Sequence, residues 1–67
     1  MKRDLTSRER EILVLLAEGQ SNKSVAERLG ISVRTVEGHR ARVMIKLELQ
    51  NLVELVKYAL RNLLIKP

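Results

Sequence analysis

The sequence predicts an all-α fold, a compact four-helix domain containing a helix-turn-helix, and three observations favour it. Apolar residues recur at helical spacing in four segments, and no segment alternates apolar and polar residues as a strand does. The apolar residues are almost all aliphatic, because Phe and Trp are absent and Tyr occurs once. Such a core suits packed helices better than an aromatic-rich sheet. Glycine occurs three times and proline only at Pro67, so nothing indicates an internal linker or repeat.

The 67 residues allow one domain, close to the smallest size at which a chain buries a stable core alone. We expect an N-terminal tail or linker remnant at residues 1–4, the folded domain at residues 5–65 and a C-terminal tail at residues 66–67. No apolar run approaches the ~20 residues of a membrane span, and the first residues lead into no signal-peptide core. We therefore expect a cytoplasmic protein without membrane contact.

The first expected helix spans residues 7–18 and has a signal at each end. Thr6-Ser7-Arg8-Glu9 fits a capping box, and Gly19 suits a left-handed C-cap. The charged run Arg8-Glu9-Arg10-Glu11 is interpreted as a solvated face whose charges offset one another. It is assigned no function beyond capping and solubility.

A helix-turn-helix is predicted where a short helix, residues 22–29, meets a longer one, residues 33–47. The join is Leu29-Gly30-Ile31-Ser32. Its glycine permits a positive φ, its isoleucine anchors the turn in the core, and its serine is a good N-cap. Other helical hairpins share this pattern, so the third helix decides the interpretation.

The chain is strongly basic, with 13 Lys and Arg against 8 Asp and Glu, a formal net charge of +5 and a pI near 10.3. Such a charge favours polyanionic partners, chiefly nucleic acid. Residues 34–46 contain four Lys or Arg and one Glu, so most of the positive surplus is on the third helix. The charge is focused on one element.

The third helix is predicted to lie in the major groove of double-stranded DNA. At 100° per residue, Val36, Val43 and Leu47 form the stripe that faces the core. The opposite face has small residues at its centre and arginines at its edges, which suits close approach to a groove and contact with base edges. Ile45 shares this face. The residues predicted to read bases are Arg34, Glu37, Gly38, Ala41 and Arg42.

The sides of the same helix are predicted to contact phosphates. Thr35, His39 and Lys46 lie along one flank, and Arg40 lies along the other. Ser32, at the helix start, completes the predicted phosphate contacts. A packed residue at the edge of the core is the alternative interpretation of His39.

Several stretches resemble one family and keep register with one another. Leu5-Thr6-Ser7-Arg8-Glu9-Arg10-Glu11-Ile12-Leu13 is similar to the opening of the LuxR-type (NarL/FixJ) helix-turn-helix domains of bacterial transcription factors. Ser21-Asn22-Lys23-Ser24-Val25-Ala26 resembles the entry to that family's second helix. Ile31-Ser32-Val33-Arg34-Thr35-Val36-Glu37-Gly38-His39-Arg40 resembles its recognition helix, closest to the FixJ branch of response regulators, and Lys46-Leu47 matches the helix end.

The resemblance covers about residues 5–65 and implies sequence-specific DNA binding in transcription regulation. It further implies the C-terminal output domain of a bacterial response regulator, with a regulatory domain elsewhere and RNA polymerase as a candidate partner. The family's base-contacting positions fall on Glu37, Gly38 and Ala41. Two residues depart from the pattern: Glu48 stands where Gly often follows Lys-Leu, and Leu52 stands where Arg is frequent.

The fourth expected helix, residues 52–64 with Asn51 as its cap, is apolar over about half its circumference. Either this small domain buries that whole face, or one edge pairs with a second subunit, as the fourth helix often does in the family. A homodimer would require symmetric half-sites. The predicted interface residues are Leu52, Leu55, Val56 and Ala59.

Other functions find less support in the sequence. One His, no Cys and no Gly-rich phosphate loop leave no catalytic set, so we expect neither an enzyme nor a metal or other cofactor. A basic module that docks on an acidic protein remains an alternative to DNA binding. Adsorption of the last helix to anionic membranes is a third possibility, disfavoured by Glu54 and by the single aromatic residue, Tyr58.

Overall fold

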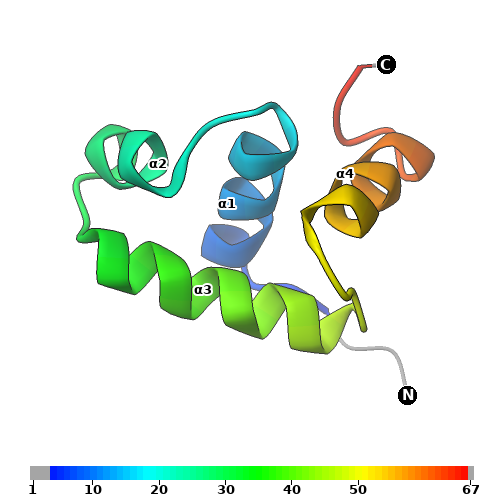
Figure 1. Ribbon diagram of the computed structural model, residues 1–67, viewed down its shortest axis with the longest axis horizontal. Coiled ribbons are helices and arrows are strands. Elements are labelled where there is room, and N and C mark those ends of the chain that lie inside the picture. The colour runs from blue at the N-terminus through cyan, green and yellow to red at the C-terminus, as the bar shows by residue number, and fades with distance from the viewer. Residues whose placement is uncertain (1–3, 67) are drawn as a thin grey trace.

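Four α-helices make up the regular structure of residues 4–66, the part of the chain that the computed structural model describes. They are α1 (Ser7–Ala17), α2 (Asn22–Leu29), α3 (Val33–Lys46) and α4 (Leu52–Arg61). In Figure 1, α3 runs along the lower edge of the domain, and the other three helices all lie above it. The predicted all-α, four-helix fold is confirmed.

Each helix begins at the N-cap that the sequence predicts. The side chains of Ser21, Ser32 and Asn51 each accept a hydrogen bond from the backbone N–H three residues later. At α1 the capping box is complete: the N–H of Glu9 donates to Oγ1 of Thr6 at 3.1 Å, and the N–H of Thr6 donates to Oε1 of Glu9 at 2.9 Å. These bonds satisfy amides that have no partner within their helix.

The first two helices end at glycines in the left-handed region. Gly19 has φ 97° after α1, and Gly30 has φ 68° after α2. In each case the next N–H donates to a carbonyl five residues back, Gln20 to Leu15 and Ile31 to Ala26, both at 3.0 Å. This is the Schellman arrangement, in which a reversed residue lets the turn satisfy carbonyls at the helix end.

The last two helices end in the same way without a glycine. Glu48 has φ 55° and Leu63 has φ 57°, and the following N–H groups donate to Met44 and Ala59, each at 2.8 Å. The fourth helix ends at Arg61, whereas the sequence predicted an end at residue 64. The left-handed backbone conformation at Leu63 is the reason for this correction. No glycine marks the position, and the signals that are present, Arg61 in the last turn and Asn62 as C-cap, were not used in the prediction.

The core lies between α1 and the other helices and is aliphatic, as expected. α1 packs against α2, α3 and α4, and α2 also packs against α3. Leu5 and Ile65, close to the two ends of the described chain, are partly buried against this core. The buried apolar residues are Ile12, Leu13, Leu16, Ala17, Val25, Ala26, Val36, Val43, Leu55 and Ala59.

Of the two tails expected from the sequence, residues 1–3 and 67 lie outside the described residues. Asp4 and Lys66 are exposed. None of the helices within residues 4–66 combines the length and the apolar character that crossing a bilayer would require.

Replacing Glu48 with glycine should raise the free energy of unfolding by about 1 kcal/mol, because a side chain in the left-handed region is strained. Gly30→Ala should have the opposite effect: at φ 68° an added Cβ meets no atom within 4 Å, so only the backbone conformation is penalised. Thermal unfolding should separate each variant from the wild type by several degrees, roughly 4–8 °C per kcal/mol for a domain of this size. An unchanged or lower melting temperature for Glu48→Gly would show that contacts of the Glu48 side chain outweigh the strain.

Candidate nucleic-acid interface

The inner side of α3 anchors the helix to the rest of the domain. Val36 and Val43, seven residues and two turns apart, are fully buried in the core. Leu47, the C-cap, is half-buried against the same core. The stripe predicted from the sequence therefore faces inward, and the opposite side of α3 faces solvent along its length.

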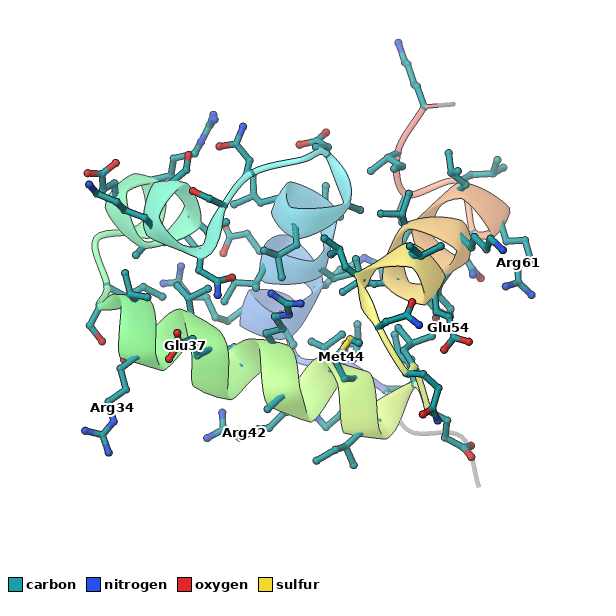
Figure 2. The ribbon with its side chains drawn as sticks, viewed as in Figure 1. Arg34, Glu37, Arg42, Met44, Glu54 and Arg61 are labelled. Carbon is teal, nitrogen blue, oxygen red and sulfur yellow. The ribbon has the colours of Figure 1, made fainter. Side chains whose placement is uncertain are left out.

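The outward side carries the residues predicted to read bases. Arg34, Glu37, Ala41 and Arg42 are exposed, and Gly38 is half-buried. Figure 2 shows Arg34 and Arg42 extending from α3 away from the other three helices. Within residues 4–66, no ion pair involves either arginine or Glu37. The structure thus brings these five residues together on one accessible surface.

Nothing in the part of the chain that the structure describes requires a glycine at position 38. A Cβ built on it would meet no atom within 4 Å, and its backbone has an ordinary helical conformation. Glycine inside a helix costs about 1 kcal/mol relative to alanine. No contact among residues 4–66 therefore accounts for a residue without a side chain at this position.

Two of the predicted phosphate-contacting residues bond to each other at the start of α3. Oγ of Ser32 accepts from the N–H of Thr35 at 3.0 Å, and the two hydroxyl oxygens lie 2.9 Å apart. Both residues are exposed. The first turn of α3 therefore presents hydroxyl groups and the positive end of the helix dipole to solvent.

The two flanks of α3 differ in what surrounds them. His39 is half-buried, and its Nδ1 atom is enclosed without a hydrogen-bond partner among residues 4–66. On the other flank, Arg40 lines a hollow of about 420 Å³ together with Asn22 of α2 and Asn51 at the start of α4. Two helix N-termini, which favour anions, border this hollow beside Arg40, and the carboxylate-bearing Glu37 also lines it.

Lys46 has a different environment from the one predicted for it. Its Nζ atom lies 2.7 Å from Oε1 of Glu9 and 3.4 Å from the backbone carbonyl of Asp4. Glu9 is 2% exposed, so this ion pair joins the end of α3 to the start of α1. The prediction of Lys46 as a phosphate contact is therefore corrected: its ammonium group is bound within the domain.

Glu9 was placed on a solvated face, and this interpretation is wrong. The hydrogen bond from Lys46 is the largest of the influences that hold the pKa of the Glu9 carboxyl below its ordinary value of 4.5. The backbone N–H of Thr6 adds to the effect, and burial opposes it. The signal was present in the sequence, because 100° per residue places Glu9 between Ile12 and Leu13 on the buried side of α1.

The structure divides the predicted dimer surface on α4. Leu55 and Ala59 are fully buried, so they have no surface to offer a second subunit. Leu52 is 43% exposed and Val56 is half-buried, and Val53, which the prediction did not include, is 62% exposed. The apolar face therefore serves the core on one side and faces solvent on the other.

Comparison with known proteins identifies the family. A family model described as bacterial regulatory proteins, luxR family, matches residues 3–59. The chain belongs to this family. The LuxR-type resemblance of the sequence is thereby confirmed, while the FixJ branch stays a prediction.

Individual luxR-family relatives agree with this assignment. The oxygen regulatory protein NreC of Staphylococcus haemolyticus (strain JCSC1435) is 51% identical over 61 residues, which are 91% of this chain and 28% of the relative. NreC of Staphylococcus aureus (strain JH9) is 50% identical over 62 residues, or 92% of this chain and 29% of the relative. The chain thus spans less than a third of the length of these relatives.

A solved structure shows the same architecture. The crystal structure of the Vibrio cholera VqmA–ligand–DNA complex superposes with a TM-score of 0.81 and 35% sequence identity, over 92% of this chain and 27% of that chain. The fold of residues 4–66 is therefore that of a domain found in a protein solved together with DNA.

Lys46→Met should destabilise the domain by about 2 kcal/mol at pH 7, because it leaves a buried carboxylate without its cation. Since the folded-state pKa of Glu9 is lowered, the pair's contribution is present above about pH 4.5 and is lost as the pH falls through the folded value. Without Lys46, the pKa of Glu9 is lowered less, so the variant should lose less stability than the wild type as the pH falls, and the difference between the two should shrink toward pH 3. Denaturant unfolding measured from pH 7 to pH 3 tests both effects.

The exposed Lys57 of α4 provides the matched control for this prediction. Lys57→Met removes the same charge from the surface and should leave the acid limb of the stability curve in place. Equal behaviour of the two variants would mean that the pair between Glu9 and Lys46 adds nothing to the fold.

Proposed function

We propose that this domain binds double-stranded DNA sequence-specifically in transcription regulation, with α3 in the major groove. The observation that carries the proposal is the outward face of α3, where cationic side chains flank a centre of Gly38 and Ala41. A major groove about 12 Å wide admits a helix, and a centre without bulk allows the backbone to approach the base edges. Membership of the luxR family of bacterial regulatory proteins supports the proposal.

The side chains of this face have complementary roles in base reading. Arg34 and Arg42 can each donate two hydrogen bonds to O6 and N7 of guanine, and Glu37 can accept from N4 of cytosine. Gly38 and Ala41 have no side-chain donor, so they contribute proximity instead of hydrogen bonds. The specificity therefore depends mainly on the three charged residues.

Phosphate contacts fix the position of the domain on the duplex. Ser32 and Thr35 offer hydroxyls at the positive end of the α3 dipole, and Arg40 lies beside the N-termini of α2 and α4. His39, on the flank of α3 opposite to Arg40, is the remaining residue proposed to contact the phosphate backbone of the DNA. Lys46 is left out of this set because its ammonium group is bound to Glu9.

A homodimer on DNA is the second part of the proposal. The exposed side of α4, with Leu52, Val53 and Val56, is the apolar surface that a second subunit would cover. Pairing of two copies about a two-fold axis places their α3 helices on symmetric half-sites. Neither Leu55 nor Ala59 takes part, because both belong to the core.

The wider setting is proposed from the length of the relatives. The chain covers 28% of NreC from S. haemolyticus, which supports its placement as the output domain of a longer regulator of the response-regulator type. A cytoplasmic location and action through RNA polymerase are further parts of this proposal. No catalytic role or cofactor is assigned to the domain. Within residues 4–66, no group of three side chains is arranged to hold a metal ion.

Selection of the domain against a random duplex library at moderate salt tests the proposal. Enrichment of a short motif in two symmetric copies supports both base reading and the dimer. Enrichment of a single half-site supports base reading and moves dimerisation away from α4. Failure to retain any duplex even at low salt would overturn DNA binding and favour docking on an acidic protein.

Two substitutions on α3 should differ in kind. Glu37→Ala should relax the preference at one base pair by roughly 1–3 kcal/mol with little change in nonspecific affinity, because it removes an acceptor for one base. Arg40→Ala should weaken all duplexes alike and reduce the slope of log K against log salt concentration by about 1, because it removes one phosphate contact. Salt titrations on matched and mismatched duplexes measure both. A loss that depends on sequence for Arg40→Ala would contradict its phosphate role.

Gly38→Ala should raise the stability of the domain by about 1 kcal/mol and weaken DNA binding by about as much or more. The added methyl group meets nothing inside the domain but occupies the space through which α3 would approach the bases. Leu63→Gly is the control, since it should relieve the strain of a side chain at φ 57° after α4 without adding atoms to this face. Undiminished DNA affinity for Gly38→Ala, measured by fluorescence anisotropy, would contradict the close approach.

A further inference from the structure

Ile45 extends the outward face of α3 toward its C-terminal end. Its side chain is 65% exposed, although isoleucine is a large apolar residue. At 100° per residue, Ile45 projects between the directions of Gly38 and Ala41, within about 20° of Arg34. It therefore lies on the centre line of the proposed DNA-reading face and away from the buried Val36 and Val43.

The centre line of this face has no polar side chain after Arg34. Gly38, Ala41 and Ile45 follow one another along it, while Glu37 and Arg42 stand to either side. An apolar side chain pressed against a hydrogen-bonding base edge would remove water from that edge and offer no replacement bond, which is unfavourable. These three residues therefore fit a part of the groove that presents an apolar group.

The major groove presents one such group, the C5-methyl of thymine. We infer that Ile45, together with Ala41, contacts thymine methyl groups, so that the preferred DNA site contains thymines opposite these two residues. This inference rests on the proposed DNA binding by α3. Four residues of helix span about 6 Å, and base pairs are 3.4 Å apart, so the two thymines lie about two base pairs from each other.

The position of Ile45 favours this contact over a protein partner. Ile45 is flanked along α3 by Ala41 and Arg42, and Val53 and Leu52 provide the separate apolar surface of α4. A single isoleucine among cationic residues that face away from the domain is a small target for a protein. It matches the size of one methyl group, and the surrounding positive charge suits the phosphates on either side of the groove.

The test uses the motif selected with the wild-type domain. Each thymine of that duplex is replaced in turn by deoxyuridine, which keeps the base pair and removes only the methyl group. At the thymine opposite Ile45, the replacement should weaken wild-type binding about fourfold, the value expected for one buried methyl group. The same replacement should leave the affinity of Ile45→Ala unchanged, because the variant no longer reaches that methyl group.

Leu63→Ala is the matched control, since Leu63 is 86% exposed after α4 and lies outside both the proposed DNA contact and the proposed dimer surface. This variant should keep the fourfold preference for thymine over deoxyuridine, whatever its overall affinity. If each replacement affects the wild type and Ile45→Ala equally, or if the selected motif contains no thymine with such an effect, the inference about Ile45 is overturned while DNA binding stands. Absence of any duplex binding by the wild type would overturn both.

Discussion

Burial of one side of α1 is the constraint on which the rest of the structure depends. α1 is the helix that packs against all three others, and its Ile12 and Leu13 side chains are inaccessible to solvent. Each such side chain contributes about 1.5–3 kcal/mol when it leaves water. Because the core is small and lacks aromatic rings, few residues supply this energy, and the direction in which α3 faces is set by two of them, Val36 and Val43.

The charged side chains of α3 serve two purposes: one stabilises the fold and others face solvent. Lys46 is used inside the domain, where it offsets the burial of Glu9 and ties the last turn of α3 to the first turn of α1. Arg34 and Arg42 lie on the side that faces away from the core. The long helix is therefore fixed at its inner edge by apolar contacts and one ion pair, and its outer charges remain available for a polyanion.

The sequence predicted the features that depend on local chemistry. Caps at Thr6, Ser21, Ser32 and Asn51 are local, because a side-chain oxygen meets an amide three residues away, and all four are present. The inward stripe of α3 followed from helical periodicity alone.

Features that depend on tertiary distance were not predicted. The partnership of Glu9 with Lys46 spans 37 residues, and no local pattern pairs them. The turn at Leu63 lacks the glycine that marks such turns, and the burial of Leu55 and Ala59 is decided by how closely α4 approaches α1. Periodicity shows which face of a helix is apolar, but not how much of that face a neighbour covers.

The reversed backbone at Glu48 has a consequence for operator geometry. The turn that contains Glu48 connects the helix proposed to enter the groove with the helix proposed to pair with a second subunit. A residue with a side chain has fewer alternative conformations than glycine, so this turn restricts changes in the orientation of α4 relative to α3. In the proposed dimer, the fold itself then fixes the separation of the two α3 helices. An operator whose half-site spacing differs from the matching one by a single base pair places its second half-site at the wrong rotation around the duplex for the second α3 helix.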